Sequence, residues 1–184
     1  VQSYLTYEPT TPMVLDVAAI QALYGANNSY NASNTTYNFT AGGRYNMTIW
    51  DGGGTDTIAY ASSSAGVIDL RSGIEGGSDL GQTVYAVTAG GSSYQAIHNV
   101  WIAYGAIIEN ATGGSGSDIL IGNEADNILN GGAGDDVFTG GAGNDTFIID
   151  RASEINSVME AADEGVDTVV LAFSGANVAI DLSA

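Results

Sequence analysis

Cysteine and lysine are absent from this 184-residue chain, and its basic residues are three arginines (Arg44, Arg71 and Arg151) and one histidine, His98. Without cysteine, the chain can form neither a disulfide nor a thiolate nucleophile. Without lysine, it cannot form a phosphate-binding P-loop. The three arginines stand against 21 acidic residues and leave a formal net charge of −18. Nucleic acids and anionic membrane surfaces are therefore poor partners for this chain.

Long apolar stretches are also missing, since no run is long enough to cross a membrane as a helix. An acidic balance of this size is common in disordered chains, but a hydrophobic content of 45% argues against permanent disorder. The two observations agree if bound cations neutralise the acid. About five Ca²⁺ ions would offset about ten charges, so we expect folding to depend on the metal.

Glycine is abundant, and much of it lies in a nine-residue repeat. Four consecutive units read GGSGSDILI (113–121), GNEADNILN (122–130), GGAGDDVFT (131–139) and GGAGNDTFI (140–148). The pattern G-G-x-G-x-D-x-U-x is typical of a calcium-binding parallel β-helix, in which each loop leads into a short strand. A flexible linker, the alternative, has no need of a large apolar residue at position 8 of every unit; here these are Leu120, Leu129, Phe138 and Phe147.

The repeat also supplies oxygen ligands at regular intervals. Glycine permits backbone conformations and close approaches that a Cβ would prevent, so main-chain carbonyls can turn inward. Position 6 adds Asp118, Asn127, Asp136 and Asp145. Ca²⁺ takes 6–8 oxygen ligands of these two kinds. Two units make one coil, so we expect Asp118 to face the loop of Asp136, and Asn127 that of Asp145.

Two further loops extend this interpretation. Residues 104–112 form a degenerate unit with Glu109 at position 6, eighteen residues before Asn127, where its charge would compensate for the amide. The segment from Asp51 to Asp56 is a single copy of the calcium loop, with Asp51 in place of the first glycine. For this isolated copy, a glycine-rich hairpin turn is the alternative.

Outside these loops, the sequence predicts one helix and many short strands. Residues 12–24 have helical periodicity, with Thr11 as a candidate N-cap and Gly25 at the C-terminal end. From residue 45 onward, short apolar runs alternate with Gly/Ser turns, which predicts strands. We therefore expect an all-β fold, a parallel β-roll continuous with a β-sandwich-like region, with one N-terminal α-helix.

These segments resemble the C-terminal region of serralysin-like secreted metalloproteases (peptidase family M10B), which carry RTX, or hemolysin-type, repeats. The similar segments are LDVAAIQALYGAN (15–27), IWDGGGTDTI (49–58), VIDLRSG (67–73) and AIIENATGGSGSDILIGNEADNILNGGAGDDVF (106–138). Beyond residue 150 the similarity fades. The calcium ligands implied by the resemblance are Arg44 (through its carbonyl), Asp51, Gly53, Asp56, Glu109, Gly114, Gly116, Asp118, Asn123, Gly132, Gly134, Asp136, Gly141, Gly143 and Asp145.

The resemblance further implies how the chain is divided. Residues 1–30 correspond to the junction after a protease domain, with a bridging helix, and residues 31–103 to β-sandwich-like strands with one calcium loop. Residues 104–150 form the RTX β-roll. The tail, residues 151–184, is predicted from a repeat instead: VDTV (166–169) and AIDL (179–182) match TDTI (55–58) and VIDL (67–70), which indicates a strand–turn–strand unit similar to the strand repeats of large RTX proteins. The opening Val1–Tyr4 is similar to the family's Met-turn, with Gln2 in place of the methionine. The resemblance implies that the chain begins just after a catalytic domain. Either that domain was removed, or Gln2 indicates that the parent protein has a decayed site.

Catalysis by this chain itself is not expected. The zinc site of the family needs H-E-x-x-H, and the chain has the single histidine His98. We therefore predict no catalytic residue and no zinc here, although the parent protein is a candidate zinc metalloendopeptidase. Calcium is the one predicted cofactor, with several ions bound.

The resemblance implies a module that folds on binding Ca²⁺ after type I secretion from a Gram-negative bacterium and stabilises an attached protease domain. The implied partners are that upstream protease-like domain and the type I secretion machinery, and the implied location is extracellular. Neither nucleic acid nor membrane insertion is expected. The alternative is a calcium-stabilised structural or adhesive segment of a large RTX surface protein, which the absence of lysine and the repeat in the tail favour.

Overall fold

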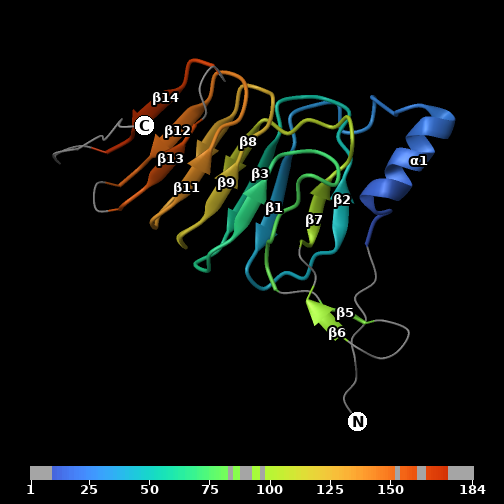
Figure 1. Ribbon diagram of the computed structural model, residues 1–184, viewed down its shortest axis with the longest axis horizontal. Helices are drawn as coiled ribbons and strands as arrows, with labels where there is room; N and C mark the ends of the chain where they lie inside the picture. Colours follow the sequence, from blue (N-terminus) through green and yellow to red (C-terminus); the bar gives the residue numbers. More distant parts are fainter. Residues whose placement is uncertain are drawn as a thin grey trace, which may run out of the picture.

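The computed structural model describes residues 10–82, 85–87, 93–95, 98–151, 154–160 and 165–173. Within these ranges the chain is mostly β, and its strands stack as successive coils of a parallel β-solenoid with one short helix at its N-terminal end (Figure 1). This confirms the predicted fold class. No helix among the described residues is long and apolar enough to span a membrane.

The elements are short, as the nine-residue period requires. In chain order they are α1 (Val14–Tyr24), β1 (Thr36–Thr40), β2 (Met47–Ile49), β3 (Thr57–Ala61), β4 (Val67–Asp69), β5 (Tyr85–Val87), β6 (Ser93–Gln95), β7 (Val100–Ile102), β8 (Asn110–Thr112), β9 (Ile119–Ile121), β10 (Ile128–Asn130), β11 (Val137–Thr139), β12 (Thr146–Ile149), β13 (Ser157–Met159) and β14 (Thr168–Leu171).

Two parallel sheets form the sides of the solenoid. One has the strand order β1-β3-β8-β10-β12-β14 and the other β13-β11-β9-β4. Pairing joins Ile119 to Val137 and Ile128 to Thr146, so equivalent residues in neighbouring coils of the repeat are eighteen apart. The predicted stacking of alternate units is therefore confirmed.

The interior is filled by the apolar residue of each repeat. Leu120, Leu129, Phe138 and Phe147 are all fully buried, and the rings of Phe138 and Phe147 meet edge to face with centroids 5.9 Å apart. By contrast, the strand residue Ile128 is 48% exposed. Alternation of inward and outward side chains along each short strand explains this difference. The predicted role of position 8 is confirmed.

The solenoid continues on both sides of the repeats. On the N-terminal side β3 pairs with β8 and β4 with β9, and on the C-terminal side β12 pairs with β14 and β11 with β13. Strand pairing thus runs across residues 103 and 150. The division of the chain at those positions stays a prediction. Residues 1–9 and 174–184, which include the Met-turn-like segment and the last predicted strand, lie outside the described residues.

The helix lies beside the first coil, at the opposite end of the solenoid from β14 (Figure 1). The predicted N-cap Thr11 is wrong, because the helix begins at Val14 after Met13. The Thr11 hydroxyl oxygen instead accepts from the Thr48 N–H (2.7 Å) and donates to the Thr48 carbonyl (3.2 Å), which ties the chain to β2. The helix ends as expected at Gly25, whose φ is +81°.

Candidate calcium centre

The predicted ligand loops lie at the edges of the two sheets where the strands begin. One residue immediately before each strand faces its equivalents in the neighbouring coils. We call the first set row A; it precedes β3, β8, β10, β12 and β14 and consists of Asp56, Glu109, Asn127, Asp145 and Asp167. The second set, row B, precedes β9, β11 and β13 and consists of Asp118, Asp136 and Asn156.

Row B forms a ladder of hydrogen bonds that joins successive coils. The Gly66 N–H donates to Asp118 Oδ1 (2.7 Å), and the Asp118 N–H donates to Asp136 Oδ1 (2.8 Å). The Asp136 N–H donates in turn to Asn156 Oδ1 (2.7 Å). Each side chain therefore uses one oxygen to hold the coil that precedes it.

Row A repeats this ladder with one interruption. The Thr35 N–H donates to Asp56 Oδ1 (2.7 Å), and the Asp56 N–H donates to Glu109 Oε2 (2.7 Å). The Asn127 N–H donates to Asp145 Oδ1 (2.7 Å). Between Glu109 and Asn127 the direction changes, because the Asn127 side-chain amide donates to the Glu109 carbonyl (2.9 Å).

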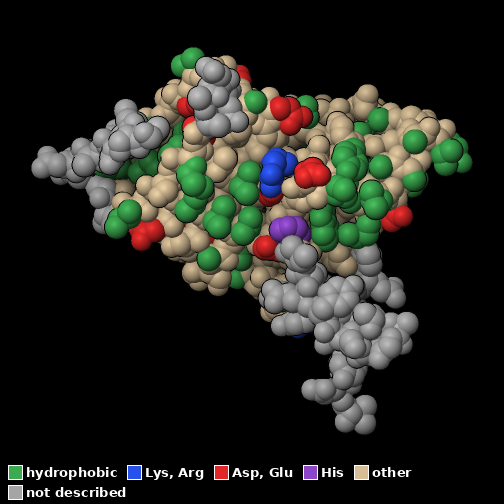
Figure 2. Space-filling model, viewed as in Figure 1, with side chains coloured by type: hydrophobic (Ala, Val, Ile, Leu, Met, Phe, Trp, Pro, Cys, Tyr) green, Lys and Arg blue, Asp and Glu red, His purple; other side chains and the backbone are tan. Residues whose placement is uncertain are grey.

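The second carboxylate oxygen is the part of these side chains that points to a cation. Asp56 and Asp136 are 0% and 1% exposed, and the Oδ2 atom of each is buried with no hydrogen-bond partner. An ionised oxygen removed from water without a donor is strongly unfavourable. A hard cation is the partner that such an oxygen fits. The acidic residues of the rows are largely hidden, and Figure 2 shows only scattered Asp and Glu side chains on the face in view.

Main-chain oxygens of one loop face the next loop of the same row. In row B, a Cβ on Gly132 would collide with the Gly114 carbonyl oxygen, and a Cβ on Gly134 with that of Gly116. Both Gly132 and Gly134 also have φ values that L-residues rarely adopt, +83° and +117°. The structure thus brings four of the predicted ligands together with Asp118 and Asp136.

The corresponding loops of row A show the same geometry. A Cβ on Gly141 would collide with the Asn123 carbonyl oxygen, and Gly143 lies against the carbonyl of Ala125. The Asn123 side-chain amide donates to the Leu70 and Ile108 carbonyls (3.1 and 2.9 Å). Its amide is therefore structural, and the oxygen available to a cation is that of its main chain.

Burial and neighbouring charge both oppose ionisation of these carboxyl groups. Burial raises the pKa of Asp136 to about 6, and the negative charges of Asp118, Glu154 and Asp150 raise it as well. The hydrogen bond from the Asp118 N–H lowers the pKa and offsets part of this shift. Burial also raises the pKa of Asp56 to about 6, with contributions from the charges of Asp51 and Glu109. Ionisation of the carboxyl groups in rows A and B is thus unfavourable unless positive charge is bound between the loops.

A pH dependence of opposite sign with and without calcium follows. In calcium-free protein, Asp56 and Asp136 have folded-state pKa values above their unfolded ones, so they favour folding below about pH 4 and lose that contribution as pH rises through about 6. With saturating Ca²⁺ the carboxylates must be ionised to bind, and stability rises over the same range. Circular dichroism at pH 4.5, 5.5 and 7 tests this, through the strength of the β signal in metal-free buffer and the urea unfolding midpoint in excess Ca²⁺. The β signal of the calcium-free chain should be strongest at pH 4.5, and a β signal and a midpoint that both rise with pH would contradict the prediction.

The isolated loop from Asp51 to Asp56 belongs to the solenoid. Strand β3 pairs in parallel with β1 and β8 and does not pair with β2, so the hairpin alternative is wrong. Asp51 is 2% exposed; it accepts from the Gly53 N–H (2.9 Å) and from the Tyr37 hydroxyl (2.6 Å). Asp51 and Asp56 thus place two buried carboxyl groups in one loop.

Glu109 lies beside Asn127 in row A, as its spacing predicts, whereas Arg44 does not occupy the position expected of it. The Glu109 carboxylate reaches back to Asp56 and adds its charge there, whereas only its carbonyl contacts Asn127. Arg44 follows the end of β1 and donates to Gln82 Oε1 (2.6 Å), while the Asp51–Asp56 loop lies at the start of β3. Since β1 and β3 are parallel and in register, Arg44 and this loop lie at opposite edges of the sheet.

The loop that stacks on Asp51–Asp56 is instead residues 28–35, which sequence reasoning did not identify. The Gly52 N–H donates to the Tyr30 carbonyl (2.9 Å), and the Thr55 N–H donates to Asn34 Oδ1 (3.1 Å). No side-chain pattern marks this loop, because its main-chain oxygens would provide the ligands.

Glu154, Asn156, Glu160 and Asp167 are also additions to the predicted set. Glu154 Oε1 accepts from the Gly134 N–H (2.9 Å), Glu160 accepts from the Gly140 N–H, and Asp167 accepts from the Asp145 N–H (3.0 Å). Glu154 Oε2 is buried without a hydrogen-bond partner, close enough to Asp136 to raise its pKa. The coil steps here are longer than eighteen residues, which hid these positions from a nine-residue pattern. The available signal was a polar residue directly before an apolar strand.

No cluster of three or more His, Cys, Asp or Glu side chains arranged to hold a metal occurs among the described residues. Sites built largely from carbonyl oxygens, with one or two carboxylates each, produce no such cluster. His98 lies partly buried beside Asp79, with 3.4 Å between His98 Nδ1 and Asp79 Oδ2, away from both rows.

Comparison with known proteins agrees with this geometry. Residues 112–147 match the family model of the RTX calcium-binding nonapeptide repeat, in four copies. Serralysin of Photorhabdus laumondii is 37% identical over 128 residues, which cover 63% of this chain and 24% of that protein. Metalloprotease AprA of Pseudomonas entomophila is 34% identical over 129 residues (64% and 24%), and serralysin C of Dickeya chrysanthemi is 44% identical over 123 residues (60% and 22%).

The matched segment spans no more than 24% of the length of these relatives. It corresponds to their repeat region and not to their catalytic domain. The chain therefore carries a calcium-binding RTX repeat region, and over most of its length it is similar to the C-terminal region of serralysin-like metalloproteases.

Proposed function

We propose that this chain is a calcium-triggered folding module, which folds outside the cell after type I secretion and stabilises an attached serralysin-like zinc metalloprotease domain. The observation that carries the proposal is the pair of buried, unpartnered carboxylate oxygens of Asp56 and Asp136 in a chain with a net charge of −18. Its implied partners are the upstream protease domain of the parent chain and the secretion machinery of a Gram-negative bacterium.

The residues that would hold the ions follow from the stacked loops. Row B offers Asp118 and Asp136 with the carbonyls of the Gly114 and Gly132 loops, and the corresponding loops of row A offer Asp145 with the main chain of Asn123. Bound Ca²⁺ would supply positive charge between successive loops. Without it, carboxylates repeated at each coil repel one another.

Stacking of loops and formation of the core are coupled in this fold. Phe138 and Phe147 become buried only when the coils on either side are in place, since each strand pairs with its counterpart in the neighbouring coils. A chain that cannot bring its loops together therefore also leaves its apolar residues exposed. Low cytosolic calcium would keep the acidic chain extended for export, and millimolar calcium outside would drive folding.

The first test is the removal of calcium from the purified chain. We expect a disordered circular dichroism spectrum in metal-free buffer. After addition of about 5 mM CaCl₂, a concentration above the roughly millimolar dissociation constants of extracellular calcium sites, we expect a β spectrum with a cooperative melting transition. Mg²⁺ is the control; it prefers a small octahedral shell and keeps its waters, so it should not substitute. An unchanged β spectrum and melting temperature in EDTA would defeat the proposal.

A second test concerns the protease. We expect the isolated chain to hydrolyse no peptide, and an upstream domain with H-E-x-x-H to lose activity faster on heating when this segment is deleted or calcium is chelated. If calcium instead makes the chain multimerise or bind glycans without any effect on an attached domain, the structural or adhesive alternative is favoured.

A further inference from the structure

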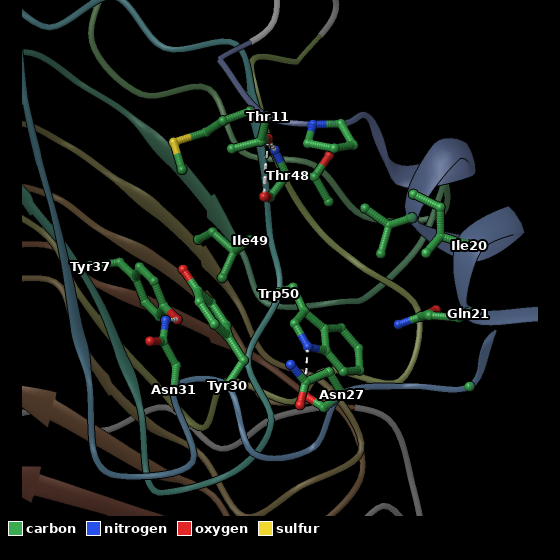
Figure 3. Close-up of a pocket in the computed structure, with 14 residues that line it drawn as sticks. Thr11, Ile20, Gln21, Asn27, Tyr30, Asn31, Tyr37, Thr48, Ile49 and Trp50 are labelled. Carbon is green, nitrogen blue, oxygen red and sulfur yellow. Dashed lines mark hydrogen bonds between the residues drawn. The ribbon is translucent and has the colours of Figure 1, made fainter.

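A cavity of about 360 Å³ separates α1 from the first coil of the solenoid (Figure 3). Val17, Ile20 and Gln21 line it from the helix, and Met47, Ile49 and Trp50 line it from β2 and the residue that follows. The helix packs loosely against the solenoid here, since Val14 is its one buried residue and Ile20 is 51% exposed. The cavity contains no residue of row A or row B, although two of its walls, Tyr30 and Tyr37, also contact the Asp51–Asp56 loop.

Its aromatic walls are held in place by hydrogen bonds. Trp50 Nε1 donates to the Asn27 carbonyl (3.1 Å). The Tyr37 hydroxyl donates to Asp51 Oδ2 (2.6 Å) and accepts from Asn31 Nδ2 (3.0 Å). The rings need no ligand to fix their positions, and walls that are ordered in advance reduce the entropy lost on binding.

Two polar side-chain atoms of lining residues lack a hydrogen-bond partner, Gln21 Nε2 and Thr48 Oγ1. Gln21 Nε2 is the one that can only donate. The side chain of Gln21 extends from α1 toward Trp50 (Figure 3), and its Nε2 is buried with no hydrogen-bond partner. A buried donor without an acceptor is unfavourable, and a ligand that brings one acceptor would remove this cost.

Charge limits the ligand further. Among the described residues no acidic or basic side chain lines the cavity, so a cation finds no counter-ion within it. The net charge of −18 opposes an anion. Apolar walls with few polar groups also suit a sugar poorly, because its hydroxyls would lose hydrogen bonds with water.

We propose that this cavity is a binding site for an uncharged apolar group that carries a hydrogen-bond acceptor, such as an aromatic ring next to an amide carbonyl. The ring packs between Trp50 and the apolar side chains of α1, and the carbonyl accepts from Gln21 Nε2.

The experiment uses calcium-loaded protein in a Trp101→Phe background, so that Trp50 is the remaining tryptophan and reports on the cavity. The probe is N-acetylphenylalaninamide. Its control is N-acetylphenylalanine, which has the same ring but a free carboxylate. We expect a saturable change in Trp50 fluorescence with the amide, and at least roughly tenfold weaker binding of the carboxylate.

Three variants locate the ligand, each checked for an unchanged β spectrum. Gln21→Leu should weaken binding of the amide roughly tenfold but leave binding of toluene, which has no acceptor, unchanged. Val17→Phe fills the cavity and should abolish binding of both probes. Leu15→Phe makes a similar change on the same helix at a residue that does not line the cavity and is 63% exposed, and should leave binding intact.

Two results would overturn the proposal. One is no saturable fluorescence change up to the solubility limit of the amide. The other is a fluorescence change of equal size with the amide and with the carboxylate, or an equal change in the Val17→Phe and Leu15→Phe variants. Either equality would show that the effect is non-specific. Side-chain amide NMR signals of Gln21 provide a second measurement, since they should shift with the amide and not with toluene.

Discussion

Replacement of Asp136 by asparagine should stabilise the calcium-free chain and destabilise the calcium-loaded one. Asparagine has nearly the same shape, and its Oδ1 can still accept from the Asp118 N–H, so the ladder between coils survives. What disappears is a buried charge that desolvation and the carboxylates of Asp118, Glu154 and Asp150 oppose. Row B already contains an asparagine that makes this hydrogen bond, because Asn156 Oδ1 accepts from the Asp136 N–H (2.7 Å).

Of the two effects of Asp136→Asn, the loss of calcium affinity should be the larger. We expect the calcium concentration at the folding midpoint to rise at least roughly tenfold, equivalent to about 1.4 kcal/mol, while the β circular dichroism signal in metal-free buffer at pH 7 increases. Asp135→Asn is the matched control; it makes the same charge change at the adjacent, exposed residue and keeps the acceptor for the Ile155 N–H (2.7 Å). A shift of the same sign in both buffers would show that Asp136 is not a calcium ligand.

Phe147→Ala should cost about 3–5 kcal/mol of the calcium-loaded stability, the range for a fully buried phenylalanine. Phe147 is 0% exposed, lies opposite Leu129 in the neighbouring coil and contacts the ring of Phe138. In a solenoid each coil contacts only its neighbours, so a cavity here weakens the stack on both sides. The outward residue Ile128, 48% exposed, is the matched control, and Ile128→Ala should cost about 0.5 kcal/mol or less.

Urea unfolding in saturating Ca²⁺, followed by circular dichroism, measures both variants. A loss this large approaches the total stability of many domains, so Phe147→Leu serves as a milder substitution if Phe147→Ala does not fold. Equal losses for Phe147→Ala and Ile128→Ala would mean that the column of inward residues does not form the core.

The sequence predicted the repeated part of the fold well because nine-residue spacing and three-dimensional position are directly linked there. Once two units form a coil, the residue before each strand must face its equivalent eighteen residues away, as Asp118 and Asp136 do. The same rule places Phe138 and Phe147 inside. Local pattern and strand pairing agree at every unit, so no long-range information was needed.

Prediction failed where neighbouring coils are separated by other distances along the chain. Asp56 and Glu109 are adjacent in row A although residues 57–108 lie between them, and Asp145 and Asp167 are adjacent across a longer loop than the repeat has. Which strands pair decides these contacts, and residue counts cannot reveal it. Arg44 was misplaced for the same reason, because the loop that stacks on Asp51–Asp56 has no ligand pattern of its own.

The ladder also separates the number of coils from the number of ions. Alignment between turns uses a single oxygen and the main-chain N–H of the preceding turn, an arrangement that asparagine makes as well as aspartate, as Asn156 does. A protein built this way can lengthen itself by turns that carry no metal, or hold more metal on the same length, through one-atom changes of side chain. The length of the solenoid and the number of ions that it binds can therefore change independently.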